Sequence, residues 1–588
     1  MSIGSFKRRA LGLPPRWKVN TNLLPHLEAL TRHRSPLSYM DDQTHVEWRE
    51  WGQEAFDEAQ ESNKPVLLSL SATWCASCHE MDTETYAEPR IAANVNDGFV
   101  PVRVDVDRHP RVRERYNMGG FPTTAFLTPE GKLLTGAMYL GPDGMRQVLD
   151  RVREMWDAKG SEAGRVPRAL AGNPTPAGEV TPAIEEHLAG QLGEKYDPQF
   201  AGWGSDAKFP MPRTVEFALK RERDQALRSL DAVRDHLLDD VAGGFFRYAA
   251  NRDWSDVNHE KLLDTNAALV RAFANAYLYT GDEMYREPAA ETIDYLTDDL
   301  WTGLAVGGSQ GPAEGRDYYL LDAEERSEER RPRTDLTVFA GGNALAAEAL
   351  LTYHAYTDDD HAREYAERIL GSLQTDLVGR EREGVVTHYV AGDDVGESLL
   401  LEDHARVVAA FCRAEQVLGE GVDVARAVAD VAIDELFDEG SFRDGRSEGP
   451  GMLDRPLRPI DSTVEMADAL LDLALLTDDE RYRNVARESI AAFAGAADRI
   501  GVQVASYGGV AARLCRDPLV VAVADDVGSD LHRAALRIAD HEKVVIPDAA
   551  DVDDAYESGT AYLLDGETAR PASNPEELMA TVAEHARL

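Results

Sequence analysis

The longest regular pattern in the sequence is a succession of amphipathic helical segments between residues 181 and 518. Apolar residues recur on single helical faces, as at Leu262, Leu269 and Phe273. Glycine–aromatic turns such as GGFFRY (243–248) separate the segments, and no strong strand pattern interrupts them. Paired helices that repeat in this way form either an open α-solenoid or a closed toroid of helical hairpins. Periodicity alone leaves both folds open.

The part of the chain before this helical region has a different pattern, with strands and helices in alternation. VLLSLSA (66–72) and FVPVRVDVD (99–107) are typical of buried strands, and helices are expected over residues 45–63 and 145–156. A stretch rich in Gly, Pro and Ala follows, and KVVIP and TAYLLDG near the C-terminus are typical of short strands. The sequence therefore predicts a multidomain α/β plus all-α protein with four parts: an α/β domain with an N-terminal extension (1–158), a linker (159–180), the helical region (181–518) and a short mixed α/β segment (519–588).

The charge of the chain restricts its partners and its compartment. Asp and Glu number 105 against 62 Lys and Arg, which gives a formal net charge of -43. Nucleic acid and anionic membrane would repel such a protein, so neither is expected as a partner. An acidic surface with few lysines suits a salt-loving cytosolic protein, because salt screens the self-repulsion. The basic N-terminus lacks a long apolar segment, so we expect no signal peptide, no membrane span and a cytoplasmic location.

The stretch TWCASCHEM (73–81) is the strongest functional signal, and it has three interpretations. Cys75-Ala76-Ser77-Cys78 has the spacing of a redox dithiol, His79 completes a haem-attachment pattern, and two cysteines with a histidine could bind zinc. A haem site would need export, and a zinc site would need a fourth ligand near the motif. Cys412 and Cys515 lie far away in the helical region, where we expect buried, unreactive thiols.

The residues around the motif favour the redox dithiol. A buried strand leads into it, and a helix beginning at Cys75 would stabilise a thiolate there. Pro122 precedes a later strand and is expected to be cis and to face the sulfurs. In this reading Cys75 attacks, Cys78 resolves the mixed disulfide, and His79 is the one nearby side chain that could hold the thiolate. We expect Trp74 to pack beside the motif. No metal or cofactor is implied.

Motifs along nearly the whole chain resemble the spermatogenesis-associated thioredoxin-domain family, which is YyaL-like in bacteria. The motifs are TNLL (21–24), RSPLSYM (34–40), NKPVLLSLSATWCASCHEM (63–81), FPTTAFLTPEGK (121–132), YDPQFAGWGSDAKFPMP (196–212), NHEKLL (258–263), LEDHA (401–405) and NPEEL (574–578). The resemblance implies a thioredoxin-like fold followed by an (α/α)6 toroid like those of six-hairpin glycosidases and sugar epimerases. Three positions depart from the family pattern: Ala76-Ser77 within the motif, Val257-Asn258 before His259, and a C-terminal segment without its cysteine pair.

Polar residues near predicted helix starts and glycine turns are candidates for the rim of a toroid cavity. Paired carboxylates there could hydrolyse a glycosidic bond, and histidines could epimerise a sugar. Each candidate can equally be an ordinary surface or structural residue in so acidic a chain. The candidates are Asp206, Lys208, Trp254, His259, Glu260, Lys261, Asp403, His404 and Asp461.

Three functions remain open on this reasoning. The favoured one is a cytosolic thiol–disulfide oxidoreductase whose toroid binds or positions a protein disulfide or a small ligand. The alternatives are a carbohydrate-active enzyme with an accessory thioredoxin-like domain, and a non-catalytic binding protein. The first requires an exposed Cys75 sulfur, and the second requires a deep cavity with two carboxylates free to act.

Overall fold

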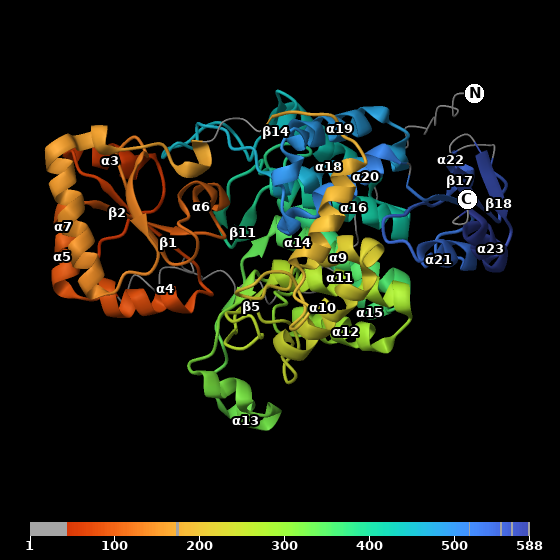
Figure 1. Cartoon of the computed structure of the whole chain (residues 1–588), viewed down its shortest axis with the longest axis horizontal. Helices are drawn as coiled ribbons and strands as arrows, with labels where there is room; N and C mark the ends of the chain where they lie inside the picture. Colours follow the sequence, from red (N-terminus) through yellow and green to blue (C-terminus); the bar gives the residue numbers. More distant parts are fainter. Residues whose placement is uncertain (1–43, 172–175, 517, 553–555, 566–567, 586–588) are drawn as a thin grey trace.

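Three bodies lie in a row in the computed structural model: a small α/β domain, a ring of helices and a second small α/β domain (Figure 1). The structure describes residues 44–171, 176–516, 518–552, 556–565 and 568–585. The motifs TNLL and RSPLSYM lie outside the described residues.

The first α/β domain is a four-stranded sheet with the order β2-β1-β3-β4 and helices on both faces. β1 and β2 are parallel, whereas β3 and β4 run antiparallel to their neighbours, which is a thioredoxin-like arrangement. α5 and α7 cover one face, and α3 and α6 cover the other. The bounds are α3 Gln53–Ser62, β1 Val66–Ser71, α4 Ala76–Met81, the π-helical turn η2 Asp82–Tyr86, α5 Pro89–Gly98, β2 Val100–Asp105, α6 Pro110–Tyr116, β3 Thr123–Leu127, β4 Leu133–Ala137 and α7 Pro142–Lys159.

The strands confirm the alternating pattern of the sequence, but the first helix is shorter than predicted. It begins at Gln53 instead of near His45. Arg49 forms a parallel bridge to Val102 of β2, so the chain before Gly52 runs along the sheet edge and cannot be helical.

The helical region forms a closed ring. Six inner helices contact one another in sequence, and the last of them, α20, contacts the first, α9, which excludes the open solenoid. The inner helices are α9 Pro212–Arg221, α11 Leu263–Thr280, α14 Ala340–Thr357, α16 Leu401–Leu418, α18 Ile460–Thr477 and α20 Ser506–Cys515. The outer helices are α8 Ala183–Lys195, α10 Arg223–Leu237, α12 Glu283–Asp298, α15 Asp360–Ser372, α17 Val422–Leu436 and α19 Glu480–Ala494. α8 packs on α20, so the two ends of the region complete one hairpin and the (α/α)6 toroid closes.

Short strands and small helices fill the loops between these hairpins. The strands are β5 Tyr248–Ala249, β6 Val257–Asn258, β7 Lys261–Leu262, β8 Ser309–Gln310, β9 Thr334–Asp335, β10 Val338–Phe339, β11 Tyr389–Ala391, β12 Asp394–Val395, β13 Phe437–Asp438 and β14 Ser441–Phe442. The small helices of the toroid are η5 Arg316–Leu320, α13 Ala323–Glu328, η6 Leu373–Leu377, η7 Ala497–Arg499 and η8 Val502–Val504. Two more, η3 Gly160–Ala163 and η4 Arg168–Leu170, lie between α7 and α8, before the toroid begins.

The C-terminal segment is a complete small domain with the topology of the first. Its sheet order is β16-β15-β17-β18, with β15 and β16 parallel and the other pairs antiparallel. Its bounds are β15 Val520–Ala524, α21 Asp530–Leu536, β16 Val544–Ile546, α22 Ala549–Val552, β17 Thr560–Asp565, β18 Thr568–Ala572 and α23 Pro575–His585. It carries no cysteine after β15, and Gly559 stands where the first domain has Pro122 before its third strand.

Two strands of this domain were predicted, but its thioredoxin-like topology was not. Among the described helices of the whole chain, none has the length and apolar character that a bilayer crossing requires.

Candidate functional site

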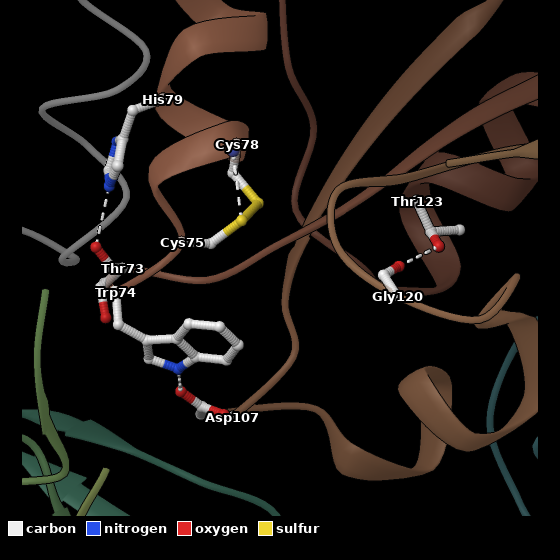
Figure 2. The surroundings of a disulfide bond; sticks show 8 residues. All are labelled: Thr73, Trp74, Cys75, Cys78, His79, Asp107, Gly120 and Thr123. Carbon is white, nitrogen blue, oxygen red and sulfur yellow. Dashed lines mark hydrogen bonds between the residues drawn. A yellow bond between two sulfur atoms is a disulfide. The ribbon is translucent and has the colours of Figure 1, made fainter. Parts of the chain in front are cut away.

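The two cysteines lie at the point where β1 ends and α4 begins. Cys75 is the N-cap residue, and its Sγ accepts a hydrogen bond of 3.1 Å from the backbone N–H of Cys78. The two sulfurs are bonded to each other at 2.07 Å (Figure 2). A free backbone N–H at a helix start stabilises a thiolate when the disulfide is reduced. The local geometry therefore suits a reversible disulfide.

Aromatic and apolar side chains close over this pair. The Phe121–Pro122 peptide bond is cis, as predicted, and Phe121 meets Trp74 edge-on with ring centroids 6.0 Å apart. Cys75 and Cys78 belong to the same apolar cluster as Trp74, and Leu262 of the toroid packs against that cluster. Each cysteine is only 3% exposed. The expectation of an exposed Cys75 is therefore wrong, because the toroid and the Trp74–Phe121 pair cover the motif together.

His79 does not stabilise a Cys75 thiolate in this structure. Its Nε2 lies 2.9 Å from the carbonyl oxygen of Thr73, and Figure 2 shows the imidazole directed toward that carbonyl and away from the sulfurs. Burial lowers the pKa of His79, so its neutral form is favoured. His79 therefore does not have the role predicted from its position in the motif. It bonds instead to the loop before Cys75.

Two aspartates beside the motif, the buried Asp105 and the half-buried Asp107, were missed by the sequence reasoning. Trp74 donates a hydrogen bond of 2.7 Å from Nε1 to Oδ2 of Asp107. Burial raises the pKa of Asp107 to about 6 and that of Asp105 well above its ordinary value. The signal was present in the sequence: the carboxyl ends of parallel strands meet at one edge, so VDVD at the end of β2 had to lie beside the segment that follows β1.

The first domain docks on the N-terminal ends of the inner toroid helices, and the loop before Cys75 takes part in this contact. Thr73 Oγ1 lies 3.4 Å from Asp335 Oδ2, and the Arg247 guanidinium lies 4.4 Å from the centre of the Trp74 ring. Toroid residues therefore contact the two residues that precede Cys75.

Arginines at the end of β2 and on α6 complete this interface. Arg111 and Arg115 both pair with Asp444, and the Arg115 contact measures 2.6 Å. Arg108 pairs with Asp394 and donates to Thr337 at 3.0 Å. These three arginines are buried, and each pairs with an acidic residue of the toroid. The pairs therefore hold the first domain on the mouth of the toroid.

His388 links the same two domains through a charged network. Its Nδ1 lies 2.8 Å from Asp403 Oδ2, and its Nε2 lies 2.7 Å from the carbonyl oxygen of Asp107. Burial opposes the charged imidazole, but the Asp403 carboxylate outweighs it and raises the pKa of His388 to about 9. The predicted residue Asp403 therefore lies at the toroid mouth as an interface residue. His404 is buried beside it, with Nδ1 2.8 Å from the Leu400 carbonyl oxygen.

The two predicted lysines have structural positions in equivalent loops. Lys208 pairs with Asp197 at 3.0 Å, and Lys261 pairs with Asp239 at 2.9 Å. Both lysines also donate to loop carbonyl oxygens and are fully buried. Each ion pair fixes one glycine–aromatic turn, so these lysines are not available to a ligand.

The remaining candidates also lie away from the lining of the central cavity. Trp254 donates to the Phe200 carbonyl oxygen, and His259 stacks on Tyr319 with ring centroids 3.8 Å apart. Asp206 and Asp461 are exposed. Glu260 is 7% exposed, its Oε2 has no hydrogen-bond partner among the described residues, and burial raises its pKa. None of these five residues is among those that line the central cavity, and their place around its rim stays a prediction.

The centre of the toroid holds a cavity of about 130 Å³. Side chains of all six inner helices and of His541, Glu542 and Lys543 from the second α/β domain line it. Most of its carboxylates pair with arginines: Glu216 and Glu348 with Arg271, Glu465 with Arg213 and Arg406, and Asp468 and Asp472 with Arg513. Within the described part of the chain, no group of three or more His, Cys, Asp or Glu side chains could hold a metal ion.

Comparisons with known proteins agree with the resemblance read from the motifs. Residues 27–171 match the family Thioredox_DsbH, described as "Protein of unknown function, DUF255". The chain is similar to human spermatogenesis-associated protein 20, with 30% identity over 312 residues that cover 46% of this chain and 39% of the human protein. The chain thus spans less than half of the length of this relative.

Two further similarities concern single domains. A rice protein named protein disulfide isomerase-like 2-2 is 32% identical over 116 residues, which cover 18% of this chain and 30% of that protein. A sugar epimerase from a ruminal bacterium superimposes on 52% of this chain and 84% of its own, with a TM-score of 0.43 and 13% identity.

Proposed function

We propose that this protein carries out thiol–disulfide exchange through Cys75 and Cys78. The observation that carries the proposal is the disulfide at the start of α4, where the Cys75 sulfur accepts the Cys78 N–H beside a cis proline in a thioredoxin-like sheet. The similarity of this domain to a protein disulfide isomerase-like protein supports it.

The exchange follows from the oxidised state of the pair. A thiolate of the substrate attacks Cys75 Sγ, a mixed disulfide forms, and the Cys75–Cys78 bond breaks with Cys78 leaving as the thiolate. A second substrate thiolate then attacks the mixed disulfide and releases Cys75. The substrate dithiol is oxidised, the protein disulfide is reduced, and the two protons released by the substrate thiols balance those taken up by the protein thiols. In the reverse direction Cys75 attacks and Cys78 resolves.

Buried carboxyl groups near the motif can serve the proton transfers. Asp107, with its pKa raised to about 6, is hydrogen bonded to the residue next to Cys75. A carboxyl group that titrates near neutral pH can exchange protons with a thiol in either direction. Asp107 is therefore the group that we propose for the proton transfers.

The closed site restricts what can react. Because each cysteine is 3% exposed and Leu262 of the toroid packs on the cluster around them, a folded partner cannot reach the sulfurs without local opening. We therefore propose a small thiol or an extended peptide segment as the substrate, and the cytoplasm as the compartment where such exchange takes place.

The test is the reduction of a small aromatic disulfide dye by the protein, with dithiothreitol as the electron donor that re-reduces the Cys75–Cys78 pair after each cycle and with the reaction of dithiothreitol alone as the background. We expect Cys75→Ser and Cys78→Ser to reduce turnover to the background rate, whereas Cys412→Ser, which removes a buried thiol of the toroid, leaves it unchanged. Equal turnover by the wild type and both motif variants would refute the proposal.

A further inference from the structure

The base of the toroid cavity contains two cations without a carboxylate partner. The other four arginines of the lining, Arg213, Arg271, Arg406 and Arg513, each pair with at least one carboxylate. Among the described residues, no carboxylate pairs with Arg413 of α16 or with Lys543, which immediately precedes β16. In a chain with a net charge of -43, acidic side chains are the commonest available partners. The lack of a carboxylate partner at both Arg413 and Lys543 therefore needs an explanation.

Arg413 is half-buried and Lys543 is buried, and neither has an ion-pair partner among the described residues. The Arg413 Nε is buried and has no hydrogen-bond partner. Lys543 is 3% exposed, its Nζ donates to the Asp540 carbonyl oxygen at 3.2 Å, and the Tyr356 ring centre lies 5.2 Å away. A buried charge without a counter-charge is costly, and two neighbouring like charges add to that cost.

The two residues respond to this cost differently. Burial, followed by the charge of Arg413, lowers the pKa of Lys543 to about 7, so Lys543 can lose its proton. The arginine cannot, because a guanidinium stays protonated in proteins. Of the carboxylates nearby, Asp472 pairs with Arg513, and Glu542 pairs with Lys220 and Arg221. His541, on the same wall, lies 2.8 Å from the Tyr279 hydroxyl, and burial lowers its pKa. The Arg413 guanidinium thus keeps its charge with no carboxylate of the described residues at ion-pair distance.

The size of the cavity limits what could neutralise this charge. Typical ligand pockets measure about 300–1,000 Å³, so an oligosaccharide does not fit, whereas a single tetrahedral oxyanion does.

We propose that Arg413 and Lys543 form a binding site for a small tetrahedral oxyanion, of the size of inorganic phosphate, at the base of the toroid cavity. The guanidinium provides paired N–H donors and the ammonium provides a second cation, a combination suited to phosphate or sulfate oxygens. The site lies between α16 and the second thioredoxin-topology domain, so the anion binds both together. The proposal is independent of the cysteine chemistry.

The test measures binding of inorganic phosphate to the full-length protein by calorimetry and by the shift in thermal unfolding, with potassium chloride at matched ionic strength as the reference. We expect phosphate to raise the unfolding temperature in a saturable way, and Arg413→Gln and Lys543→Gln to weaken its affinity about tenfold or more. Arg363→Gln is the matched control, because it removes an arginine from an exposed pair with Glu367 on the outer helix α15. Phosphate affinity equal in the wild type and Arg413→Gln, or no effect of phosphate beyond that of chloride, would overturn the proposal.

Hydrogen exchange of the wild-type protein provides a second readout that depends on no variant. Phosphate should slow amide exchange in the C-terminal half of α16 and around β16 (Val544–Ile546). Slowing confined to other segments, or none at all, would contradict the site.

Discussion

The two thioredoxin-topology domains share a sheet order but contact the toroid through different parts of the fold. The first docks on the N-terminal ends of the inner helices through Arg108, Arg111 and Arg115, each with an acidic partner. The second docks on the C-terminal ends, where His532 and Val545 bond to Gln416 of α16, and it brings Lys543 into the cavity without such a partner. One domain keeps its cysteines after the first strand, and the other has none there.

This difference separates two uses of buried charge. At the mouth, paired charges fix the position of a domain that carries its chemistry in the strand–helix loop. At the base, the loop after the first strand of the second domain holds no cysteine, and the segment before its second strand supplies a cation without an ion-pair partner. Charges that serve structure are satisfied within the chain, whereas an unsatisfied charge indicates a ligand.

The largest effect on the free energy of unfolding is expected at the mouth of the toroid, where the first domain docks. Asp444→Asn removes the carboxylate shared by Arg111 and Arg115, whose side chains are at most 5% exposed. The Arg115 guanidinium then loses its carboxylate partner, and Arg111 keeps only Glu397 at 3.4 Å. We expect a loss of about 3–5 kcal/mol in the free energy of unfolding, measured by urea denaturation. Asp430→Asn, which breaks the surface pair with Arg481, should cost less than about 1 kcal/mol. Equal costs would remove the distinction between the interface and the surface.

A pH-dependent effect is expected at the same interface. The folded-state pKa of His388 is raised from 6.5 to about 9, so its contribution is complete below pH 6.5 and is lost as the pH rises through 9. The loss should be on the order of 2–3 kcal/mol in the wild type and absent in His388→Gln. A pH dependence of stability that is unchanged in His388→Gln would contradict the assigned role of the His388–Asp403 pair.

At the base of the toroid, the expected pH dependence of stability has the opposite sign. The folded-state pKa of Lys543 is lowered from 10.5 to about 7, so between these values the unfolded chain binds a proton that the folded chain does not. Stability from this group therefore rises with pH, by at most about 1.4 kcal/mol per pH unit. Denaturation of Lys543→Met and the wild type at pH 7 and pH 9 without phosphate isolates the effect, which should vanish in the variant. A wild-type difference that persists in Lys543→Met would show that Lys543 is not the titrating group.

The smallest effect concerns access to the cysteines. Leu262→Ala removes a toroid side chain that packs against the apolar cluster containing the cysteines. We expect the rate at which the reduced protein reacts with a disulfide dye to rise by up to about tenfold, because a partly buried leucine contributes on the order of 1 kcal/mol. Leu304→Ala, in another toroid loop, is the control and should leave the rate unchanged. A rate that Leu262→Ala does not raise would show that Leu262 does not limit access.

The sequence predicted the local elements of the site better than their surroundings. The strand before Cys75, the helix after it and the cis Pro122 followed from local residue patterns. The burial of the cysteines did not, because Arg247 packs on Trp74, and Leu262 on the apolar cluster that contains the cysteines, from a separate domain. Lys208 and Lys261 resembled functional residues because composition does not show that Asp197 and Asp239 pair with them. Arg413 and Lys543 were missed because only the closed ring and the docked C-terminal domain bring them together.

The most decisive experiment on the proposed chemistry is to react reduced Cys78→Ser protein with a limiting aromatic disulfide dye and to locate the adduct by peptide mass spectrometry. The account predicts a stable mixed disulfide on Cys75, whereas in the wild type Cys78 displaces the adduct and the Cys75–Cys78 disulfide re-forms with release of a second dye thiolate. An adduct on Cys515 with none on Cys75, or a wild-type adduct that Cys78 never displaces, would contradict it.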